Sequence, residues 1–140
     1  MGAEPSALNE IEERCDSIEE CYELMLAYAG KGSASDEGSQ VRYHLERAAR
    51  AIQDLAQGFR KLVESAGIEP VSKYHAFLAV LERDAADSLA AIELVLAQPA
   101  ISSQLIDNLN ASMHLRALLT DIFLIDGALS ERSRADQAAS

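Results

Sequence analysis

The sequence predicts an all-α fold, a four-helix bundle in up-down-up-down order. Apolar residues recur every three or four positions through most of the chain, which is the spacing of one face of an α-helix. Glycine and proline interrupt this pattern at a few points, and no segment shows the strict alternation of a β-strand. The chain has 140 residues, the length of one ordinary domain with its own apolar core.

The first two helices are expected at about 6–29 and 40–66. Ser6 can cap the first of them, and Gly30 follows its last apolar position. The second has an unbroken apolar stripe and ends before Gly67, a residue suited to the turn after a helix. The segment between the two helices is rich in glycine and serine, which predicts a flexible loop.

The other two helices are expected at about 70–97 and 100–129. Pro70 suits the first turn of the third helix, and Pro99 separates the third from the fourth. Short links of this kind place successive helices antiparallel. The last segment, 130–140, is small and polar, and we expect a disordered tail there.

The chain is strongly acidic, with a formal net charge of −11 at pH 7. Residues 1–29 concentrate this charge, because they hold eight acidic residues and one basic residue. Such a surface repels phosphate backbones and anionic lipid headgroups, so we expect binding to neither nucleic acid nor membranes. The longest apolar stretch contains charged residues and falls short of the roughly 18–20 apolar residues of a membrane span.

The two cysteines, Cys15 and Cys21, lie six positions apart in the first predicted helix. Their side chains point about 120° apart around the helix axis, which is incompatible with a disulfide between them. Two free thiols are typical of a reducing compartment, and we therefore expect a cytoplasmic protein.

The helix predicted at 100–129 differs from the others because its second half is apolar on two sides. One stripe is expected to face the core: Leu105, Leu109, Met113, Leu119, Phe123 and Leu124. The second stripe lies on an adjoining face: Leu115, Leu118, Ile122, Ile125 and Leu129. We expect this second stripe to bind a partner, as a homodimer seam or a groove for a partner helix. The alternative is that the termini or the long loop cover it.

Di-iron bundles hold their metal with Glu-x-x-His pairs that point inward. None of the three histidines has a carboxylate three positions before it, because those positions hold Val41, Ser72 and Ala111. A ferritin-like metal-binding bundle is therefore the weakest alternative, and we expect no metal and no cofactor.

One histidine is followed by basic and small residues at a spacing typical of a phosphoryl acceptor. His44 is followed by Arg47 at the third position, Ala48 at the fourth and Ala51 at the seventh. This pattern resembles that of histidine-phosphotransfer domains, which are acidic helical bundles of similar size. The resemblance implies that His44 accepts the phosphoryl group and that Arg47 steadies it. It covers these few residues, and Glu46 stands where that family has an apolar residue.

Motifs of nucleophilic enzymes, such as Gly-x-Ser-x-Gly or a glycine-rich phosphate loop, do not occur in the sequence. We therefore expect a non-enzymatic protein-interaction, scaffold or adaptor domain that self-associates through the second half of the helix at 100–129. A histidine-phosphotransfer-like bundle that uses His44 is the alternative function.

Overall fold

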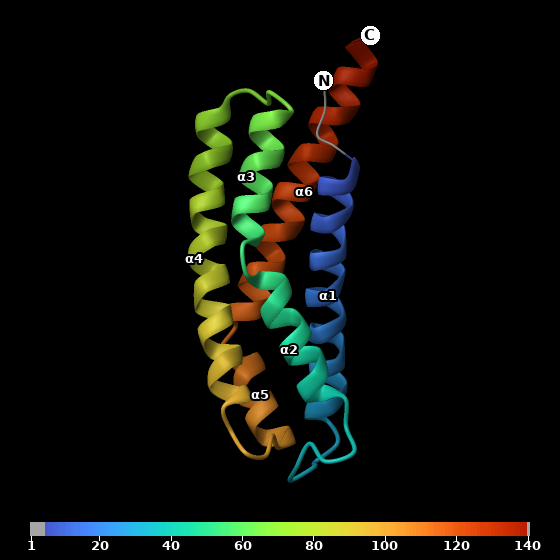
Figure 1. Ribbon diagram of the computed structural model, residues 1–140, viewed down its shortest axis with the longest axis vertical. Coiled ribbons are helices and arrows are strands. Elements are labelled where there is room, and N and C mark those ends of the chain that lie inside the picture. The colour runs from blue at the N-terminus through green and yellow to red at the C-terminus, as the bar shows by residue number, and fades with distance from the viewer. Residues whose placement is uncertain (1–4, 140) are drawn as a thin grey trace.

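The computed structural model describes residues 5–139, and over that range the chain forms only α-helices and loops. The predicted all-α class is therefore confirmed. Figure 1 shows an elongated molecule whose helices lie side by side. Six helices follow one another along the chain: α1 (Pro5–Ala29), α2 (Val41–Ile52), α3 (Leu55–Ser65), α4 (Val71–Leu96), α5 (Ser103–Ala111) and α6 (His114–Ala139).

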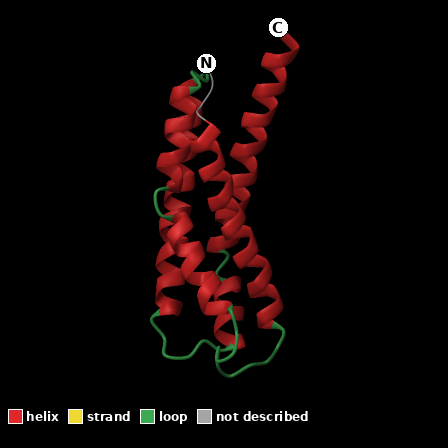
Figure 2. Ribbon diagram, turned by 45° about the vertical axis from the view of Figure 1, so that its right-hand side comes forward, coloured by secondary structure: helices red, strands yellow, loops and turns green. Residues whose placement is uncertain are grey.

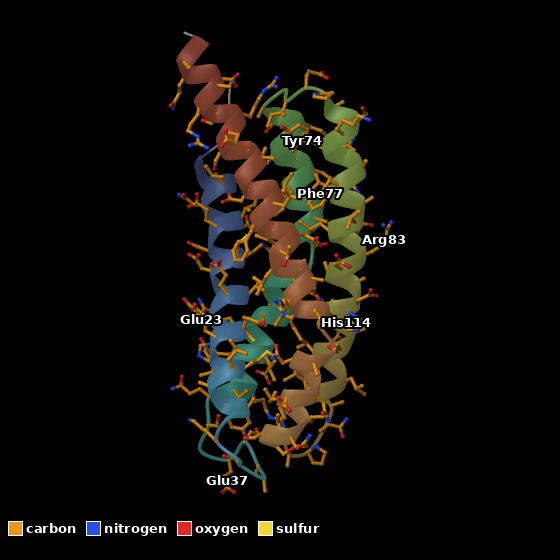
Figure 3. All side chains as sticks on the ribbon, turned by 180° about the vertical axis from the view of Figure 1, so that it is seen from behind. Glu23, Glu37, Tyr74, Phe77, Arg83 and His114 are labelled. Carbon is orange, nitrogen blue, oxygen red and sulfur yellow. The ribbon has the colours of Figure 1, made fainter. Side chains whose placement is uncertain are left out.

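The helices surround one core. α2 and α3 follow each other along the side of α1, and α4 packs against both of them. Seen from behind, α6 lies between α1 and α4, with Glu23 and Arg83 on the outer sides of these two neighbours (Figure 3). The last turns of α6 diverge from the other helices and extend beyond them (Figure 2).

The helix predicted at 40–66 is in fact two helices, α2 and α3. The break falls at Asp54, whose φ of 61° lies in the left-handed region. Arg14, on α1, holds this break in place. Its Nη1 donates to the carbonyl oxygens of Arg50, Ala51 and Gln53, at 3.2, 3.2 and 2.7 Å. These are carbonyls at the end of a helix, where the helix itself offers no donor.

The helix predicted at 100–129 is also two helices, α5 and α6, and it begins later than expected. Ser102 caps α5, because its hydroxyl accepts a hydrogen bond from the backbone N–H of Leu105 at 3.0 Å. Met113 separates α5 from α6 and has a φ of 66°. α6 then continues through Ala139, so the structure places helix where the sequence predicts a disordered tail.

An ion pair ties the loop between α1 and α2 to the start of α2, and hydrogen bonds from both partners reach the end of α4 and the loop after it. Asp36 accepts from Nε of Arg42 at 2.9 Å and from the backbone N–H of Ile101 at 2.8 Å. Arg42 also donates to the carbonyl oxygens of Leu96 and Gln98, each at 2.9 Å. The loop that composition marks as flexible is therefore anchored through a half-buried pair.

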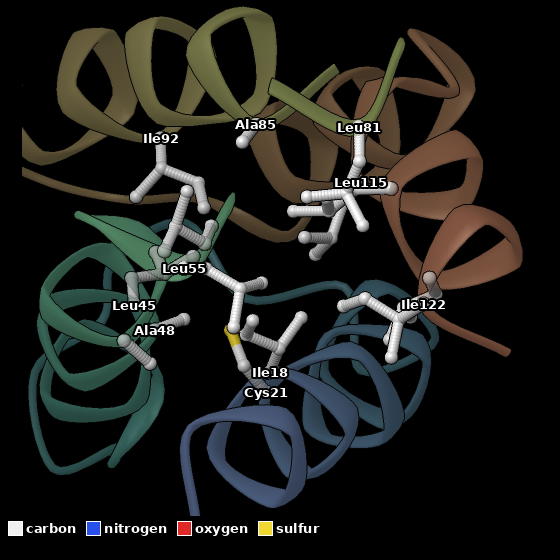
Figure 4. Close-up of a cluster of buried hydrophobic side chains, with 14 of the residues drawn as sticks. Ile18, Cys21, Leu45, Ala48, Leu55, Leu81, Ala85, Ile92, Leu115 and Ile122 are labelled. Atoms are coloured by element: carbon white, nitrogen blue, oxygen red, sulfur yellow. The ribbon is translucent and has the colours of Figure 1, made fainter. Parts of the chain in front are cut away.

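The core receives apolar side chains from every helix. Figure 4 shows side chains from α1, α2, α3, α4 and α6 converging, with the sulfur of Cys21 among them. Burial of this kind is the main source of stability in a domain of this size. Over the residues that the structure describes, no helix is long and apolar enough to cross a membrane.

Candidate partner-binding groove

The second apolar stripe of the predicted fourth helix lies inside the molecule. Leu115, Leu118, Ile122 and Ile125 are buried within the single chain, and Leu129 is half-buried against the core. Figure 4 shows Leu115 and Ile122 pointing inward from α6. The prediction that this stripe forms an exposed interface is therefore wrong for these four residues.

Three of the six side chains expected in the core are exposed instead. Met113, Phe123 and Leu124 are each more than half exposed, whereas Leu119 is buried. The physical cause is the break at Met113, because the left-handed residue shifts the helical phase of everything that follows. A stripe drawn through Leu109 as if one helix continued therefore ends on the wrong face of α6.

A groove of about 870 Å³ lies between the first half of α1 and the second half of α6. It forms where α6 diverges from α1 (Figure 2). The side chains that line it are apolar at the floor and polar along the edges: Leu8, Ile11, Glu12, Cys15, Asp16, Glu19, Phe59, Leu62, Ala66, Ile68, Ile122, Phe123, Asp126, Leu129, Ser130, Arg132, Ser133, Asp136 and Gln137.

Each wall of the groove presents a large exposed apolar side chain. Leu8 on α1 is 41% exposed, and Phe123 on α6 is 55% exposed. Between them, Ile11, Phe59 and Ile122 are buried and form the floor. Exposed apolar side chains that share one concave surface mark a place where another molecule can be bound.

Five carboxylates line the groove, and four of them, Glu12, Asp16, Glu19 and Asp126, act on the thiol of Cys15. Burial, followed by the charges of Asp126, Glu19, Asp16 and Glu12, raises the pKa of the Cys15 thiol to about 12. The thiol therefore lies in a strongly negative field and stays protonated near neutral pH.

The same crowding acts on one of the carboxylates itself. The pKa of Glu19 is raised, first by partial burial and then by the charges of Asp16, Glu23 and Asp126. A nearby cation, or the removal of one negative charge, would reduce the repulsion between these carboxylates.

Two acidic residues on the side of α1 that faces α2 pair with bases. Glu20 accepts from Nη1 of Arg47 on α2 at 2.7 Å, and Glu10 pairs with Arg14 at 3.1 Å. Arg50 lies beside them at the same surface. Arg14 and Arg47 therefore neutralise Glu10 and Glu20, whereas no base pairs with Glu12, Glu19 or Asp126 within the described part of the chain.

The candidate phospho-acceptor pair is not assembled. His44 is half-buried on α2, its Nδ1 is buried without a hydrogen bond, and its ring meets that of Tyr43 edge-on. Arg47 points to Glu20 on α1. Among residues 5–139, no three histidine, cysteine, aspartate or glutamate side chains are grouped so that they could hold a metal ion.

Of the five residues predicted to bind a partner, the structure places two, Ile122 and Leu129, in the groove. The sequence reasoning missed Leu8 and Phe123. A signal for the groove was present on α1, where Glu12, Asp16 and Glu19 follow one edge of the apolar stripe at helical spacing.

Known proteins add no constraint on the function of this site. No family model, no curated protein and no solved structure matches the chain.

Proposed function

We propose that this chain is a non-enzymatic protein-interaction domain that holds an α-helical segment of a partner in the groove between α1 and α6. The observation that carries the proposal is the pairing of exposed Leu8 and exposed Phe123 across a buried apolar floor. An amphipathic helix laid into an apolar groove is a common mode of protein recognition. It would cover both side chains and remove their apolar surface from water.

The length of the groove suits a short helix. The α1 wall runs from Leu8 to Glu19, which at 1.5 Å per residue is about 16 Å. A partner segment of about three turns matches this length, with apolar side chains at every third or fourth position. The contacts of such a helix would centre on Phe123, because aromatic side chains contribute most in protein interfaces.

The test uses a designed helix rather than a natural partner. A neutral peptide of about four turns, built from leucine, alanine and glutamine with one uncharged lactam staple between a lysine and a glutamate side chain, presents one apolar stripe. Because the chain has no tryptophan, one tryptophan in the peptide reports binding by its fluorescence. We expect saturable binding that weakens at least about tenfold, or about 1.4 kcal/mol, in the double variant Leu8→Ser, Phe123→Ser.

The matched control is Leu124→Ser. Leu124 is 60% exposed and follows Phe123 in α6, but it does not line the groove. Its variant should bind the peptide as the unmodified chain does. The proposal is wrong if neither this peptide nor a second version with lysine at the positions that flank the apolar stripe binds. It is also wrong if the control loses as much affinity as the double variant.

A second copy of the chain is the other occupant to consider, because the sequence predicts self-association through this helix. Light scattering after size-exclusion chromatography measures the mass directly. A mass near twice 15.1 kDa that returns to one chain in Phe123→Ser would make the groove a homodimer seam. A mass of one chain in both proteins leaves a different protein as the occupant.

We propose a reducing, cytoplasmic setting for this interaction. Support comes from the two thiols, which are both unpaired. Cys21 is buried among core side chains, where its burial raises the pKa of the thiol to about 12 (Figure 4). A thiol of that kind is a packing group and takes no part in redox chemistry.

A further inference from the structure

Four of the five carboxylates along the groove form no ion pair within the described part of the chain. Glu12, Asp16 and Glu19 stand on the α1 wall, and Asp126 stands on the α6 wall. None of these four forms an ion pair with another residue in the part of the chain that the structure describes. Nε of Arg132, which also lines the groove, lies 3.9 Å from Oδ1 of Asp136. The positive charge of Arg132 is therefore offset by Asp136.

This arrangement differs from the rest of the acidic surface of α1. On the side that faces α2, Glu10 and Glu20 pair with Arg14 and Arg47. On the groove side, an apolar floor separates two acidic edges, one on each wall. A chain that neutralises one face of a helix and leaves the other charged favours a cationic partner at the second face.

We propose that the groove selects a basic amphipathic helix, whose apolar stripe covers Phe123 and whose flanking lysine or arginine side chains reach the acidic edges. This inference rests on the proposed function and adds the charge of the partner to it. Lysine and arginine suit the task because their aliphatic stems cover apolar surface while their charged ends reach the rim. The groove would repel a fatty acid or any other ligand that brings a carboxylate to the same edges.

The experiment compares two peptides that differ only in charge. The first is the neutral glutamine peptide described above, and the second carries lysine at the positions that flank the apolar stripe. Surface ion pairs are individually weak, so several together are expected to give about a tenfold preference for the lysine peptide at low salt. That preference should shrink in 0.5 M salt, where charges on the surface are screened.

Two variants of equal net charge separate the groove from the general acidity of the chain. The groove variant carries Glu12→Gln, Asp16→Asn, Glu19→Gln and Asp126→Asn. The remote variant neutralises four exposed acids that do not line the groove: Glu37→Gln, Glu46→Gln, Glu93→Gln and Asp107→Asn. We expect the groove variant to bind both peptides equally and the remote variant to keep most of the tenfold preference.

Each outcome decides between the two proposals. If both peptides bind in the groove with equal affinity, the charge inference fails and the proposed function stands. If the two variants lose the preference equally, the attraction belongs to the whole surface and the inference fails again. If neither peptide binds the unmodified chain, the proposed function itself is wrong. A preference lost only in the groove variant supports both.

Discussion

The carboxylate of Asp36 lies 2.9 Å from Nε of Arg42 and also accepts the backbone N–H of Ile101, so one side chain joins three segments. These contacts favour the charged carboxylate. The hydrogen bond from Arg42, then that from Ile101, hold the pKa of Asp36 below its usual range, although burial opposes them. The pair therefore holds the α1–α2 loop against the end of α4.

We expect Asp36→Asn to destabilise the fold by about 1–3 kcal/mol, because it leaves the guanidinium of Arg42 without its anion. The pH dependence has a definite sign. Since the folded pKa is below the unfolded one, the stabilisation is present above about pH 4 and is lost as pH falls through the folded pKa. Urea unfolding at pH 3 and pH 7 measures both effects.

The control for this prediction is Glu37→Gln. Glu37 is the next residue and is exposed at the tip of the same loop (Figure 3). Glu37→Gln removes the same charge as Asp36→Asn. Glu37 itself makes no side-chain ion pair in the described part of the chain. Equal destabilisation by the two variants would show that the Asp36–Arg42 pair contributes nothing special.

Arg14 gives a second prediction about the fold. Its guanidinium supplies donors to carbonyl oxygens at the end of α2, at the break before α3. Arg14→Met keeps the aliphatic stem and removes the donors. We expect a loss of about 1–3 kcal/mol in the free energy of unfolding, as for hydrogen bonds from a charged group.

Arg83→Met is the matched variant for this experiment. Arg83 points outward from α4 (Figure 3), and its removal should change stability by less than about 0.5 kcal/mol. Chemical denaturation of the two proteins side by side measures the difference. Equal stabilities would mean that α2 ends at Ile52 for a reason other than Arg14.

The sequence predicts the helical class and the positions of most helices because the apolar spacing is a local property. It does not predict the break at Asp54, where neither proline nor glycine interrupts the pattern. Arg14, forty residues away in the chain, donates hydrogen bonds at this break, and such a contact leaves no local mark in the sequence. Met113 is a similar case, since a non-glycine residue with positive φ is uncommon.

Because the sequence does not predict the break at Met113, it also assigns the wrong side chains of α6 to the candidate site. Once α5 and α6 are drawn as one helix, the apolar residues of α6 fall on the wrong sides. Phe123 is then assigned to the core and Leu118 to the surface, which reverses their true burial. The acidic edge of α1 was visible in the sequence, but the opposite edge at Asp126 required the packing of α6 against α1.

The neighbouring carboxyl groups of Asp84 on α4 and Asp121 on α6 predict a pH effect of opposite sign to that of Asp36. Burial, then a hydrogen bond with Asp84 and the charge of that carboxylate, raise the pKa of Asp121 to about 7. A raised pKa means that the folded state holds a proton that the unfolded chain releases. The contribution of Asp121 to stability is therefore greatest below about pH 4 and is lost as the pH rises through 7.

Asp121→Asn should consequently raise stability at pH 8 and change it little at pH 4. After a discount for partial exposure to solvent, we expect a gain of about 1 kcal/mol, or a few degrees in Tm. Asp87→Asn, at an exposed site on α4, removes one charge without touching the pair. Thermal unfolding of the three proteins at both pH values tests this, and an equal gain in both variants would contradict it.

The burial of α6 gives the last prediction, which compares Leu118 with Phe123. Leu118 is fully buried and Phe123 is more than half exposed. Leu118→Ala should cost about 2–5 kcal/mol, because it leaves a cavity in the core. Phe123→Ala should change stability by less than about 0.5 kcal/mol.

Charged replacements sharpen the contrast. Leu118→Glu places an unpaired carboxylate in the core and should prevent folding, whereas Phe123→Glu should fold normally and lose the helical peptide. Circular dichroism and urea denaturation measure the first result, and peptide fluorescence measures the second. A folded Leu118→Glu protein would mean that Leu118 faces solvent, as the uninterrupted helix predicted, and would contradict the orientation of α6 on which the groove depends.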